Sequence, residues 1–268
     1  MAKQTRSVVI HGAGGRMGGR LVALSGDAGL NVAAAIDRPD HPRLGDDAGA
    51  VAGGESLGIP LTADWPDANT HVDAVIEFSA PAGLRGAIDR CVEAGWPMVI
   101  GTTGLTADDE AKLDEAAKAT ALLHASNFSR VVNVLWTLAA EAARMLGDDY
   151  DLEVLEAHHR FKHDAPSGTA LTLVRKLCEA TGRDFNRDVV YARHGEAPRQ
   201  KKDITVQTLR IGDDPGQHNA FFAGLGERLE IKHVSTSRDS YASGALDAAK
   251  WLMNKPAGRY DIRDVLGL

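Results

Sequence analysis

Apolar runs of strand length alternate with longer, helix-like segments through the first half of the chain. The strand-length runs fall at residues 8–10, 32–36, 72–78, 98–100 and 122–125. Helical patterns lie between some of them, at residues 82–94 and 107–120. Strands that are buried on both faces read as continuous apolar runs, so this order predicts an α/β domain with a parallel sheet and crossover helices.

The pattern changes from about residue 151, where apolar and polar positions alternate. Residues 203–209 and 228–235 alternate in this way, which is typical of strands with one more exposed face in a mixed or antiparallel sheet. Only one covering helix is evident, over residues 169–181, so the other face is expected to meet another subunit. A last helical pattern, at residues 241–254, is expected to return to the first domain. The second domain is therefore predicted to be a smaller α+β unit with a mixed, open sheet.

The composition is that of an ordinary globular protein. The chain has 268 residues, of which 44% are hydrophobic and 25% charged, and its formal net charge of -7 argues against a nucleic-acid partner. No apolar run approaches the roughly 18 residues of a membrane helix, so no membrane partner is expected. Residues 1–6 are polar and lead into a strand rather than a signal-peptide core. Cys91 and Cys178 lie far apart without metal or redox spacing, which favours reduced, buried thiols in a cytoplasmic protein.

A glycine-rich segment follows the first apolar run at once. It consists of Gly12, Ala13, Gly14, Gly15, Arg16, Met17 and Gly18. The pattern GxGxxG fails at Met17, whereas GxxGxxG fits through Gly12, Gly15 and Gly18. Glycines let the backbone approach a pyrophosphate, and the helix expected over residues 16–24 would offer N–H groups and the positive end of its dipole. The alternative is a plain structural turn.

The position of an acidic residue strengthens the nucleotide interpretation. The apolar run at residues 32–36 ends in Asp37, nineteen residues past Gly18, where a dinucleotide-binding fold places an acid on the adenosine ribose hydroxyls. Arg38 follows directly, and its guanidinium could pair with a 2′-phosphate or stack on adenine. A solvated loop charge is the alternative for Arg38. With both residues side by side, the sequence predicts tolerance of NADH and NADPH.

Two further segments follow apolar runs and precede helical patterns. They comprise Gly101, Thr102, Thr103 and Gly104, and then Ala125, Ser126, Asn127 and Phe128. Ligands bind at such strand ends in open parallel sheets, so we expect both segments to line the cofactor site. The alternative is that each is a helix start with a capping serine or threonine.

The densest group of chemically active side chains lies further along the chain. Residues 158–163 hold five potential cations, namely His158, His159, Arg160, Lys162 and His163. In an acidic chain, such a cluster just ahead of a helix start favours binding of a small anion. His159 and His163 have the spacing of a metal pair, but no third ligand or HExxH pattern is evident and Pro166 argues against a helix there. We therefore expect no metal, and a solvated loop is the other alternative.

The residues after the cluster complete the anion site. Ser167, Gly168 and Thr169 open the helix expected over residues 170–181, so their N–H groups could hold a carboxylate. Lys162 would add a point charge beside it. A histidine, with an ordinary pKa of about 6.5, can supply a proton at neutral pH. A phosphate-binding turn followed by an anion and proton-transfer site predicts a nicotinamide-dependent reductase.

The order of these motifs resembles one enzyme family. The run EAHHRFKHDAPSGTA, which begins at Glu156, closely resembles the signature of the 4-hydroxy-tetrahydrodipicolinate reductases, also called dihydrodipicolinate reductases. Matches in order and spacing also occur at residues 12–18, 101–104, 126–129 and 226–230, so the resemblance spans nearly the whole chain. It implies NADPH- or NADH-dependent reduction of 4-hydroxy-tetrahydrodipicolinate, a small dicarboxylate, in bacterial lysine and diaminopimelate synthesis.

The resemblance also implies a role for each matching residue. His158 would be the proton donor and acceptor, and Lys162 a second proton donor. Contacts to substrate would come from His159, Gly168 and Thr169. Contacts to the cofactor would come from Gly12, Ala13, Gly14, Gly15, Arg16, Met17, Asp37, Arg38, Gly101, Thr102, Thr103, Ala125, Ser126, Asn127 and Phe128. Phe161 stands where some relatives carry another histidine, so that position is not expected to be essential to the chemistry.

The family is homotetrameric through its substrate-domain sheets, which agrees with the open sheet face expected here. We expect residues 1–129 and 239–268 to form a Rossmann-type dinucleotide-binding domain, and residues 130–238 a substrate-binding and tetramerisation domain. Two alternatives from other classes remain. Another Rossmann oxidoreductase, such as an amino-acid dehydrogenase, would share the glycine turn without requiring the histidine and lysine cluster. A non-catalytic dinucleotide sensor would bind cofactor without turnover.

Overall fold

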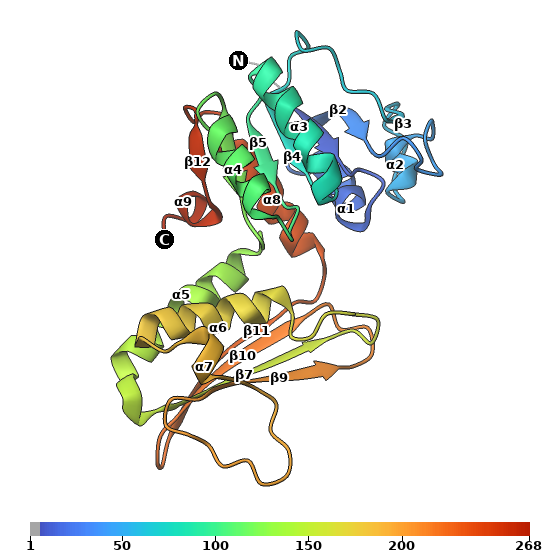
Figure 1. The fold of residues 1–268 in the computed structure, drawn as a ribbon. Helices are drawn as coiled ribbons and strands as arrows, with labels where there is room; N and C mark the ends of the chain where they lie inside the picture. Colours follow the sequence, from blue (N-terminus) through green and yellow to red (C-terminus); the bar gives the residue numbers. More distant parts are fainter. Residues whose placement is uncertain (1–5) are drawn as a thin grey trace. The chain divides into compact units, whose positions relative to one another are not determined.

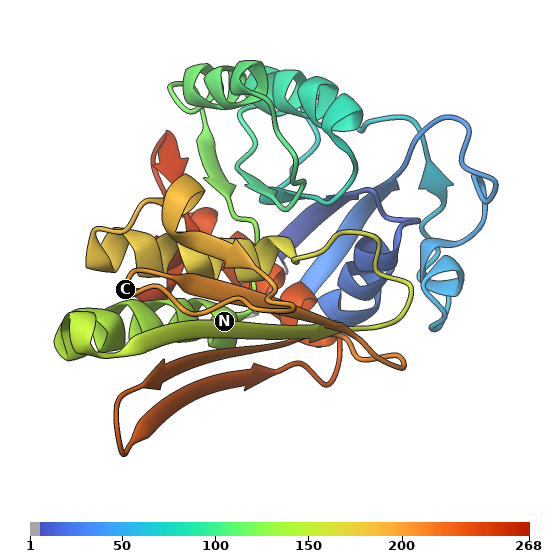
Figure 2. The same ribbon diagram turned by 60° about the horizontal axis from the view of Figure 1, so that its bottom comes forward.

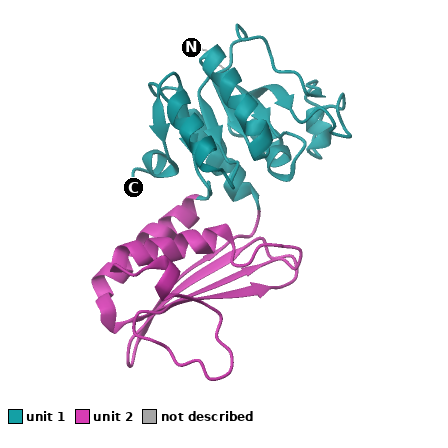
Figure 3. Cartoon of the chain, viewed as in Figure 1, with its two compact units in different colours: residues 1–129, 238–268 teal, residues 130–237 magenta. Residues whose placement is uncertain are grey.

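The computed structural model describes residues 6–268, which divide into two compact units (Figure 3). Unit 1 comprises the chain up to Ser129 together with Arg238–Leu268, and unit 2 is Arg130–Ser237. Each unit has its own sheet and its own buried core. The polar stretch considered above for a signal peptide lies, at residues 1–5, outside the described residues.

Unit 1 is built on a seven-stranded parallel sheet (Figure 1). Across the sheet, the strands are β12 (Gly258–Tyr260), β6 (Ala121–His124), β5 (Met98–Ile100), β4 (Ala74–Glu77), β1 (Arg6–His11), β2 (Leu30–Ile36) and β3 (Leu61–Thr62). All pairings between these strands are parallel, which confirms the predicted Rossmann-type domain. The strand order reverses between β1 and β4, and ligands of such sheets bind beside this point at the carboxyl ends of the strands.

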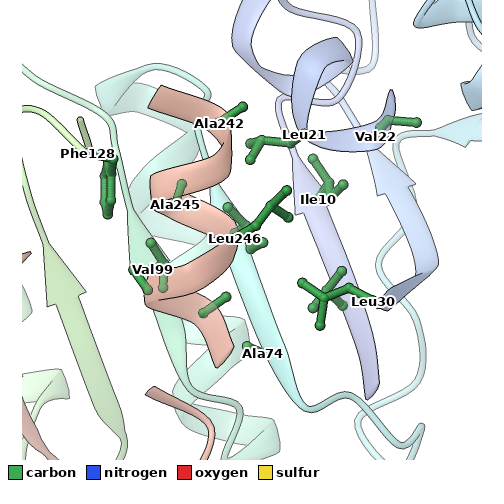
Figure 4. Close-up of a cluster of buried hydrophobic side chains, with 14 of the residues drawn as sticks. Ile10, Leu21, Val22, Leu30, Ala74, Val99, Phe128, Ala242, Ala245 and Leu246 are labelled. Carbon is green, nitrogen blue, oxygen red and sulfur yellow. The ribbon is translucent and has the colours of Figure 1, made fainter. Parts of the chain in front are cut away.

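Helices cover both faces of this sheet. α1 (Arg16–Ser25) and α8 (Asp239–Leu252) share one buried cluster with the strands, and α3 (Pro81–Ala94) and α4 (Ala107–Ala116) share another on the opposite face. Figure 4 shows the first cluster, in which α8 contributes Ala242, Ala245 and Leu246. The remaining helices are short, α2 (Ala48–Val51) and α9 (Ile262–Leu266). The last part of the chain therefore completes the core that the first part begins.

Unit 2 is built on a five-stranded mixed sheet. Across the sheet, the strands are β11 (Arg228–Val234), β10 (Gln217–Ala223), β7 (Asp151–His158), β9 (Ile204–Arg210) and β8 (Val189–Tyr191). β7 and β8 run parallel to β9, whereas β10 runs antiparallel to β7 and β11 (Figure 2). The mixed sheet predicted for the second domain is confirmed.

The helical cover of this second sheet corrects one expectation. Two long helices, α5 (Arg130–Leu146) and α6 (Gly168–Thr181), rather than one, pack with the strands around a buried cluster. The sequence pattern hides α5 because it also exposes apolar residues, namely Val131, Val134 and Leu138. A 3-10 turn (Gly147–Asp149) and the short helix α7 (Phe185–Asp188) follow α5 and α6 respectively.

The face of the second sheet away from these helices is only partly open. Glu153 of β7 accepts hydrogen bonds from Arg193 and Arg199, so the long loop between β8 and β9 covers part of this face. Leu209 of β9 and Val234 of β11 lie in one row of paired residues across the sheet and are 44% and 48% exposed. This part of the face therefore presents apolar side chains to solvent.

Candidate active site

The glycine turn between β1 and α1 has the backbone geometry of a phosphate site. Gly12 has a φ of +83°, and a Cβ there would lie 2.5 Å from the carbonyl oxygen of Phe78. A Cβ at Gly18 would lie 1.9 Å from the carbonyl oxygen of Gly12, so only glycine lets α1 pack this close to the turn. Gly15 is the N-cap residue of α1 and makes no side-chain cap. The N-terminal N–H groups of α1 can therefore receive an anion.

Asp37 at the end of β2 contacts the glycine turn. Its Oδ2 accepts a hydrogen bond from the N–H of Gly14 at 2.8 Å, and its Oδ1 accepts one from the N–H of Arg38 at 2.8 Å. The Arg38 guanidinium lies 3.4 Å from Asp40, and the Arg38 side chain is 64% exposed. The structure thus brings Asp37 to the turn and leaves Arg38 at the surface beside it.

The other two predicted cofactor segments follow β5 and β6 at the same edge of the sheet. A Cβ at Gly101 would lie 2.2 Å from the ring of Phe78, so the backbone passes close to that ring. Phe128 and Thr102 are buried, and the ring centroids of Phe128 and Phe78 are 5.5 Å apart. Glycine at positions 12 and 101 therefore lets two segments of this edge pack against Phe78. This edge is where dinucleotides bind in open parallel sheets.

Exposure divides the remaining predicted cofactor residues. Those with exposed side chains are Arg16, Thr103 and Ser126. Those buried in unit 1 are Ala13, Ala125 and Asn127, and Met17 is partly buried against the core. Asn127 accepts the N–H of Ser129 at 2.8 Å through its Oδ1. The buried members shape the edge of the sheet, and the exposed members can contact a ligand with their side chains.

The sequence pattern did not reveal a buried polar pair at this edge. His11 ends β1 and Glu77 ends β4, on the two sides of the strand-order reversal, and both are buried. Glu77 Oε1 accepts the N–H of Ser79 at 2.7 Å and lies 3.7 Å from Nδ1 of His11. Burial lowers the pKa of His11, while the charges of Glu77 and Asp37 act in the opposite direction. A polar residue that ends each of two apolar strands is the sequence feature that could have indicated this pair.

A buried charge network of unit 2 lies at the end of β7. His158 is the last residue of β7, not part of the loop expected to carry it, and Glu156 lies two residues earlier on the same face of the strand. Nδ1 of His158 is 2.5 Å from Oε2 of Glu156, which is completely buried. Arg210 pairs with His158 across the sheet, and its guanidinium lies 3.1 and 3.2 Å from the two oxygens of Glu156.

This network keeps Glu156 ionised. Burial acts to raise the pKa of Glu156, but the hydrogen bonds and charges of His158 and Arg210 outweigh burial and lower the pKa to about 2. An ionised Glu156 accepts the proton of His158 Nδ1, which leaves Nε2 as the nitrogen that can exchange a proton with a ligand. A Cβ at Gly216 would lie 2.9 Å from Nε2, so glycine at that position leaves room above the ring.

Two further histidines extend across the sheet from this network. His218 of β10 pairs with Glu156, and His233 of β11 pairs with His218. The ring centroids of His158 and His218 are 5.3 Å apart, and those of His218 and His233 are 5.8 Å apart. Burial, and then the charges of His158 and His233, lower the pKa of His218 to about 3. The sequence pattern indicated neither histidine, because β10 was not predicted as a strand and no local motif connects His218 or His233 to the cluster at residues 158–163.

The loop after β7 holds the rest of the basic cluster. Nζ of Lys162 lies 2.8 Å from Asp164, and the N–H of Lys162 donates to the carbonyl of His159 at 3.1 Å. Arg210 also donates to the carbonyl of Asp164, so one arginine ties this loop to Glu156. Burial acts to raise the pKa of Asp164, but Lys162 outweighs burial and lowers it. The loop thus forms a turn with Lys162 fixed beside it, while Arg160 and His163 are exposed.

Ser167, Gly168 and Thr169, the three residues expected to bind a carboxylate at the start of α6, differ in burial. Ser167 is buried, and its Oγ accepts the N–H of Ala170 at 3.2 Å. The N–H of Ser167 donates to Glu156 at 3.2 Å, and its Oγ lies 3.2 Å from Nε2 of His218. Gly168 is exposed, with open space where a Cβ would lie, and Thr169 is partly exposed. Ser167 therefore supports the site from inside, and Gly168 and Thr169 form its outer surface.

A cavity of about 430 Å³ opens beyond the end of β7. Its lining consists of Ile211, Gly212, Asp213, Asp214, Pro215 and Ser235. The N–H of Ile211 donates to the carbonyl of His158 at 2.8 Å, which places this cavity next to the network. Within residues 6–268, no group of three or more His, Cys, Asp or Glu side chains could hold a metal ion, and no helix is long and apolar enough to span a membrane.

Comparison with known proteins gives matches along nearly the whole chain. The family model of the dihydrodipicolinate reductase N-terminus matches residues 6–128, and that of the C-terminus matches residues 131–266. The 4-hydroxy-tetrahydrodipicolinate reductase of Anaeromyxobacter dehalogenans is 47% identical over 264 residues, which cover 97% of each chain. That of Acinetobacter baumannii is 44% identical over 260 residues, which cover 97% of this chain and 95% of the relative.

Solved structures share the fold at lower identity. A dipicolinate-bound dihydrodipicolinate reductase from Paenisporosarcina sp. TG-14 has a TM-score of 0.76 at 21% identity, over 96% of this chain and 98% of the other. An amine dehydrogenase from Mycobacterium smegmatis has a TM-score of 0.59 at 15% identity, over 97% of this chain and 96% of the other. At these identities, both matches show a similarity of fold.

Proposed function

The chain belongs to the dihydrodipicolinate reductase family and is an NAD(P)H-dependent oxidoreductase of lysine and diaminopimelate synthesis, and we propose that it reduces 4-hydroxy-tetrahydrodipicolinate with His158 as general acid. One observation carries the assignment of His158. Its Nδ1 is held at 2.5 Å by the buried carboxylate of Glu156, next to the start of α6. An imidazole fixed in this way presents a single nitrogen, Nε2, to a ligand.

The net reaction consumes one hydride and one proton and releases one water. Loss of the 4-hydroxyl as water leaves a conjugated cyclic imine, and NAD(P)H, when bound, supplies a hydride to ring carbon 4. The displaced electron pair moves back into the ring and needs a proton, which His158 would donate from Nε2. Because the pKa of Glu156 is lowered to about 2, its carboxylate stays ionised while His158 loses and regains that proton.

A small dicarboxylate suits the groups around His158. The related Paenisporosarcina protein binds dipicolinate, a flat ring with two carboxylates. Here one substrate carboxylate would meet the N–H groups of Gly168 and Thr169 at the start of α6 and the ammonium of Lys162. A helix N-terminus stabilises an exposed anion by about 0.3 to 1 kcal/mol and a partly buried anion by up to about 2 kcal/mol. Lys162 must therefore supply a large share of the binding free energy of the carboxylate. His159 would contact the same substrate from the adjoining turn.

The carboxyl edge of the parallel sheet would hold the cofactor. The glycine turn and the N-terminus of α1 would take the pyrophosphate, and Asp37 the adenosine ribose. Arg38 would pair with the 2′-phosphate of NADPH. The segments after β5 and β6 would contact the nicotinamide half mainly through backbone groups, because several of their side chains are buried.

We also propose a homotetramer located in the cytoplasm. Leu209 and Val234 on the partly open face of the second sheet support burial of that face against another copy of the chain. Cys91 and Cys178 are free, buried thiols, which suits a reducing compartment. Light scattering at micromolar protein tests the assembly.

A coupled assay tests the reaction. The protein is given the condensation product of pyruvate and aspartate semialdehyde, and the absorbance of NADPH or NADH is followed. We expect oxidation of the reduced cofactor. No oxidation with either cofactor would contradict the proposed reaction. Cofactor binding without any turnover would favour a dinucleotide sensor, and oxidation of an amino acid with NAD⁺ or NADP⁺ would favour an amino-acid dehydrogenase.

A further inference from the structure

His41 lies against the glycine turn at the point where Gly14 has no side chain. A Cβ added to Gly14 would lie 2.5 Å from Nε2 of His41 and 3.1 Å from Oδ2 of Asp37. Nε2 of His41 and Oδ2 of Asp37 therefore both lie beside the backbone of Gly14. The sequence motifs single out Asp37 and Gly14 but not His41.

The backbone of the loop after β2 fixes His41 in this place. The N–H of His41 donates to the carbonyl of Arg38 at 3.0 Å, and the carbonyl of His41 accepts the N–H of Leu44 at 3.2 Å. Leu44 in turn packs against the buried core of unit 1. Two successive turns thus anchor the residue that carries the ring.

The hydrogen bonding of the ring selects its tautomer. Nδ1 of His41 accepts a hydrogen bond from the N–H of Arg43 at 3.3 Å. In the neutral ring the proton therefore resides on Nε2, the nitrogen that faces Gly14. Nε2 is a donor in both protonation states. Protonation places the second proton on Nδ1, where it replaces the hydrogen bond accepted from Arg43, and gives the ring a positive charge.

The 2′ position of the adenosine ribose is expected near Oδ2 of Asp37, and Nε2 of His41 lies on the same side of Gly14. In dinucleotide-binding folds, the acid at the end of the second strand binds the ribose hydroxyls, so this step rests on the cofactor role proposed above for Asp37. A 2′-hydroxyl can donate to Asp37 and accept from His41. A 2′-phosphate is repelled by Asp37 and attracted by a protonated His41. We propose that His41 is a cofactor-binding residue that reads the 2′ position, and that its protonation raises the affinity for NADPH relative to NADH.

The charged groups around His41 allow this effect to be isolated. On its own loop they are Asp37, Arg38, Asp40 and Arg43, and Arg16 follows the glycine turn. Arg38 lies 3.4 Å from Asp40, and Arg43 lies 2.8 Å from Asp46. Arginines stay charged throughout, and ordinary aspartates are ionised above about pH 5. A phosphate monoester titrates near about pH 6. The contribution of His41 is therefore obtained by comparing variants with one another.

Binding of 2′,5′-ADP and 5′-ADP to the full chain tests the proposal without substrate. Calorimetry at about pH 5.8 and about pH 8 gives the preference for the 2′-phosphate at each pH. We expect this preference to be about fivefold greater at the lower pH in the unmodified protein, the size of one partly exposed ion pair. His41→Gln keeps a neutral donor near Nε2, so we expect it to bind 5′-ADP normally and to lose this extra preference.

His71→Gln is the matched control. His71 is an exposed histidine of the same unit that lies 3.5 Å from Asp73, outside the glycine turn. Its replacement should therefore change the affinity for neither nucleotide. An identical pH response in His41→Gln and the unmodified protein would overturn the proposal. Equal weakening of both ligands in His41→Gln would overturn it too, because His41 would then contact the shared part of the nucleotide.

A measurement on the unmodified protein covers the case in which the variant folds poorly. The ring resonances of His41 are followed by NMR against pH, with each nucleotide bound. We expect the ring resonances at a given pH to differ between 2′,5′-ADP and 5′-ADP. The same resonances with both nucleotides would contradict the proposal. Since neither ligand is a substrate, these results are independent of the reaction proposed for His158.

Discussion

Arg210 and Glu156 form an ion pair in which one guanidinium nitrogen contacts both carboxylate oxygens, at 3.1 and 3.2 Å. The carboxylate is completely buried, so removal of its arginine leaves a buried charge with only the hydrogen bonds from His158 and Ser167. We expect Arg210→Met to lower the free energy of unfolding by about 3 kcal/mol, measured by urea denaturation. The control is Arg228→Met, which removes an exposed partner of Glu230 in the same sheet and should cost less than about 1 kcal/mol. Equal losses in the two variants would show that burial of the pair does not matter.

Replacement of His158 tests the general acid. His158→Gln keeps a hydrogen-bonding side chain but removes the titratable proton, so we expect kcat to fall by about 100- to 10,000-fold with a modest change in KM. Steady-state kinetics with NADPH measure this. His163→Gln removes an exposed histidine of the same cluster and should leave kcat near the unmodified value. A His158 variant that retains most of its kcat would leave the acid unidentified.

Replacement of Lys162 separates substrate binding from cofactor binding. Lys162→Met keeps the aliphatic stem and deletes the charge that lies 2.8 Å from Asp164. If the ammonium binds a carboxylate and assists protonation, KM should rise and kcat should drop together. The affinity for NADPH, measured by fluorescence titration, should stay unchanged. If KM and kcat of this variant equal those of the unmodified protein, Lys162 does not contact the substrate.

The buried histidine row predicts a loss of stability in mild acid. The folded-state pKa of His218 is lowered to about 3, whereas an unfolded histidine titrates at about 6.5. Below about pH 6.5 the unfolded chain binds a proton that the folded chain does not, so the free energy of unfolding falls as the pH falls. One such group contributes a slope of up to about 1.4 kcal/mol per pH unit between those values.

Urea denaturation between about pH 5 and pH 6.5 measures this slope before most carboxylates titrate. His218→Asn should reduce it, while the lowered pKa values of His11, His124 and His233 leave a residual slope of the same sign. A slope that does not change in the variant would mean that His218 is protonated in the folded protein.

Substitutions at the end of β2 should move cofactor preference in opposite directions. Arg38→Ala removes an exposed cation beside Asp37, so we expect NADPH to bind more weakly while NADH changes little. Asp37→Ala removes the acceptor for the ribose hydroxyl and relieves repulsion of a phosphate, so NADH should weaken more. Dissociation constants for both cofactors check this. Equal losses for the two cofactors in Arg38→Ala would show that Arg38 does not bind the 2′-phosphate.

Continuous apolar runs located five strands of the parallel sheet, and the short strands β3 and β12 were not predicted. The run at residues 98–100 is β5 to the residue, and the run at 122–125 is β6 displaced by one. The alternating segments located β9 and β11 to within one residue at each end. The pattern predicted neither β7 nor β10 as strands, because each mixes apolar core residues with charged or histidine side chains on the same face, such as Val154 and Glu156.

The candidate site could be predicted only as far as local spacing reaches. The cluster around His158 and the turn at Gly12 are contiguous in the sequence, so their composition reveals them. Arg210 reaches Glu156 from another strand, 54 positions away, and no local pattern connects them. The role of Ser167 also depends on this network. Its N–H donates to Glu156 and its hydroxyl accepts from Ala170, so neither group is left for a ligand. Such pairings follow from strand register, which the sequence pattern did not specify.

The return of α8 to the first sheet has a consequence for how the protein is made. Ile10 and Val99 belong to a core that also needs Leu246, which is translated after the whole of unit 2. A nascent chain that has been synthesised only as far as Ser129 would expose the apolar face of the sheet that α8 later covers. Such an exposed apolar face can bind chaperones or aggregate. On the ribosome, all residues of unit 2 are therefore synthesised before unit 1 is complete. Unit 1 can complete its core only when its last segment, Arg238–Leu268, has been translated.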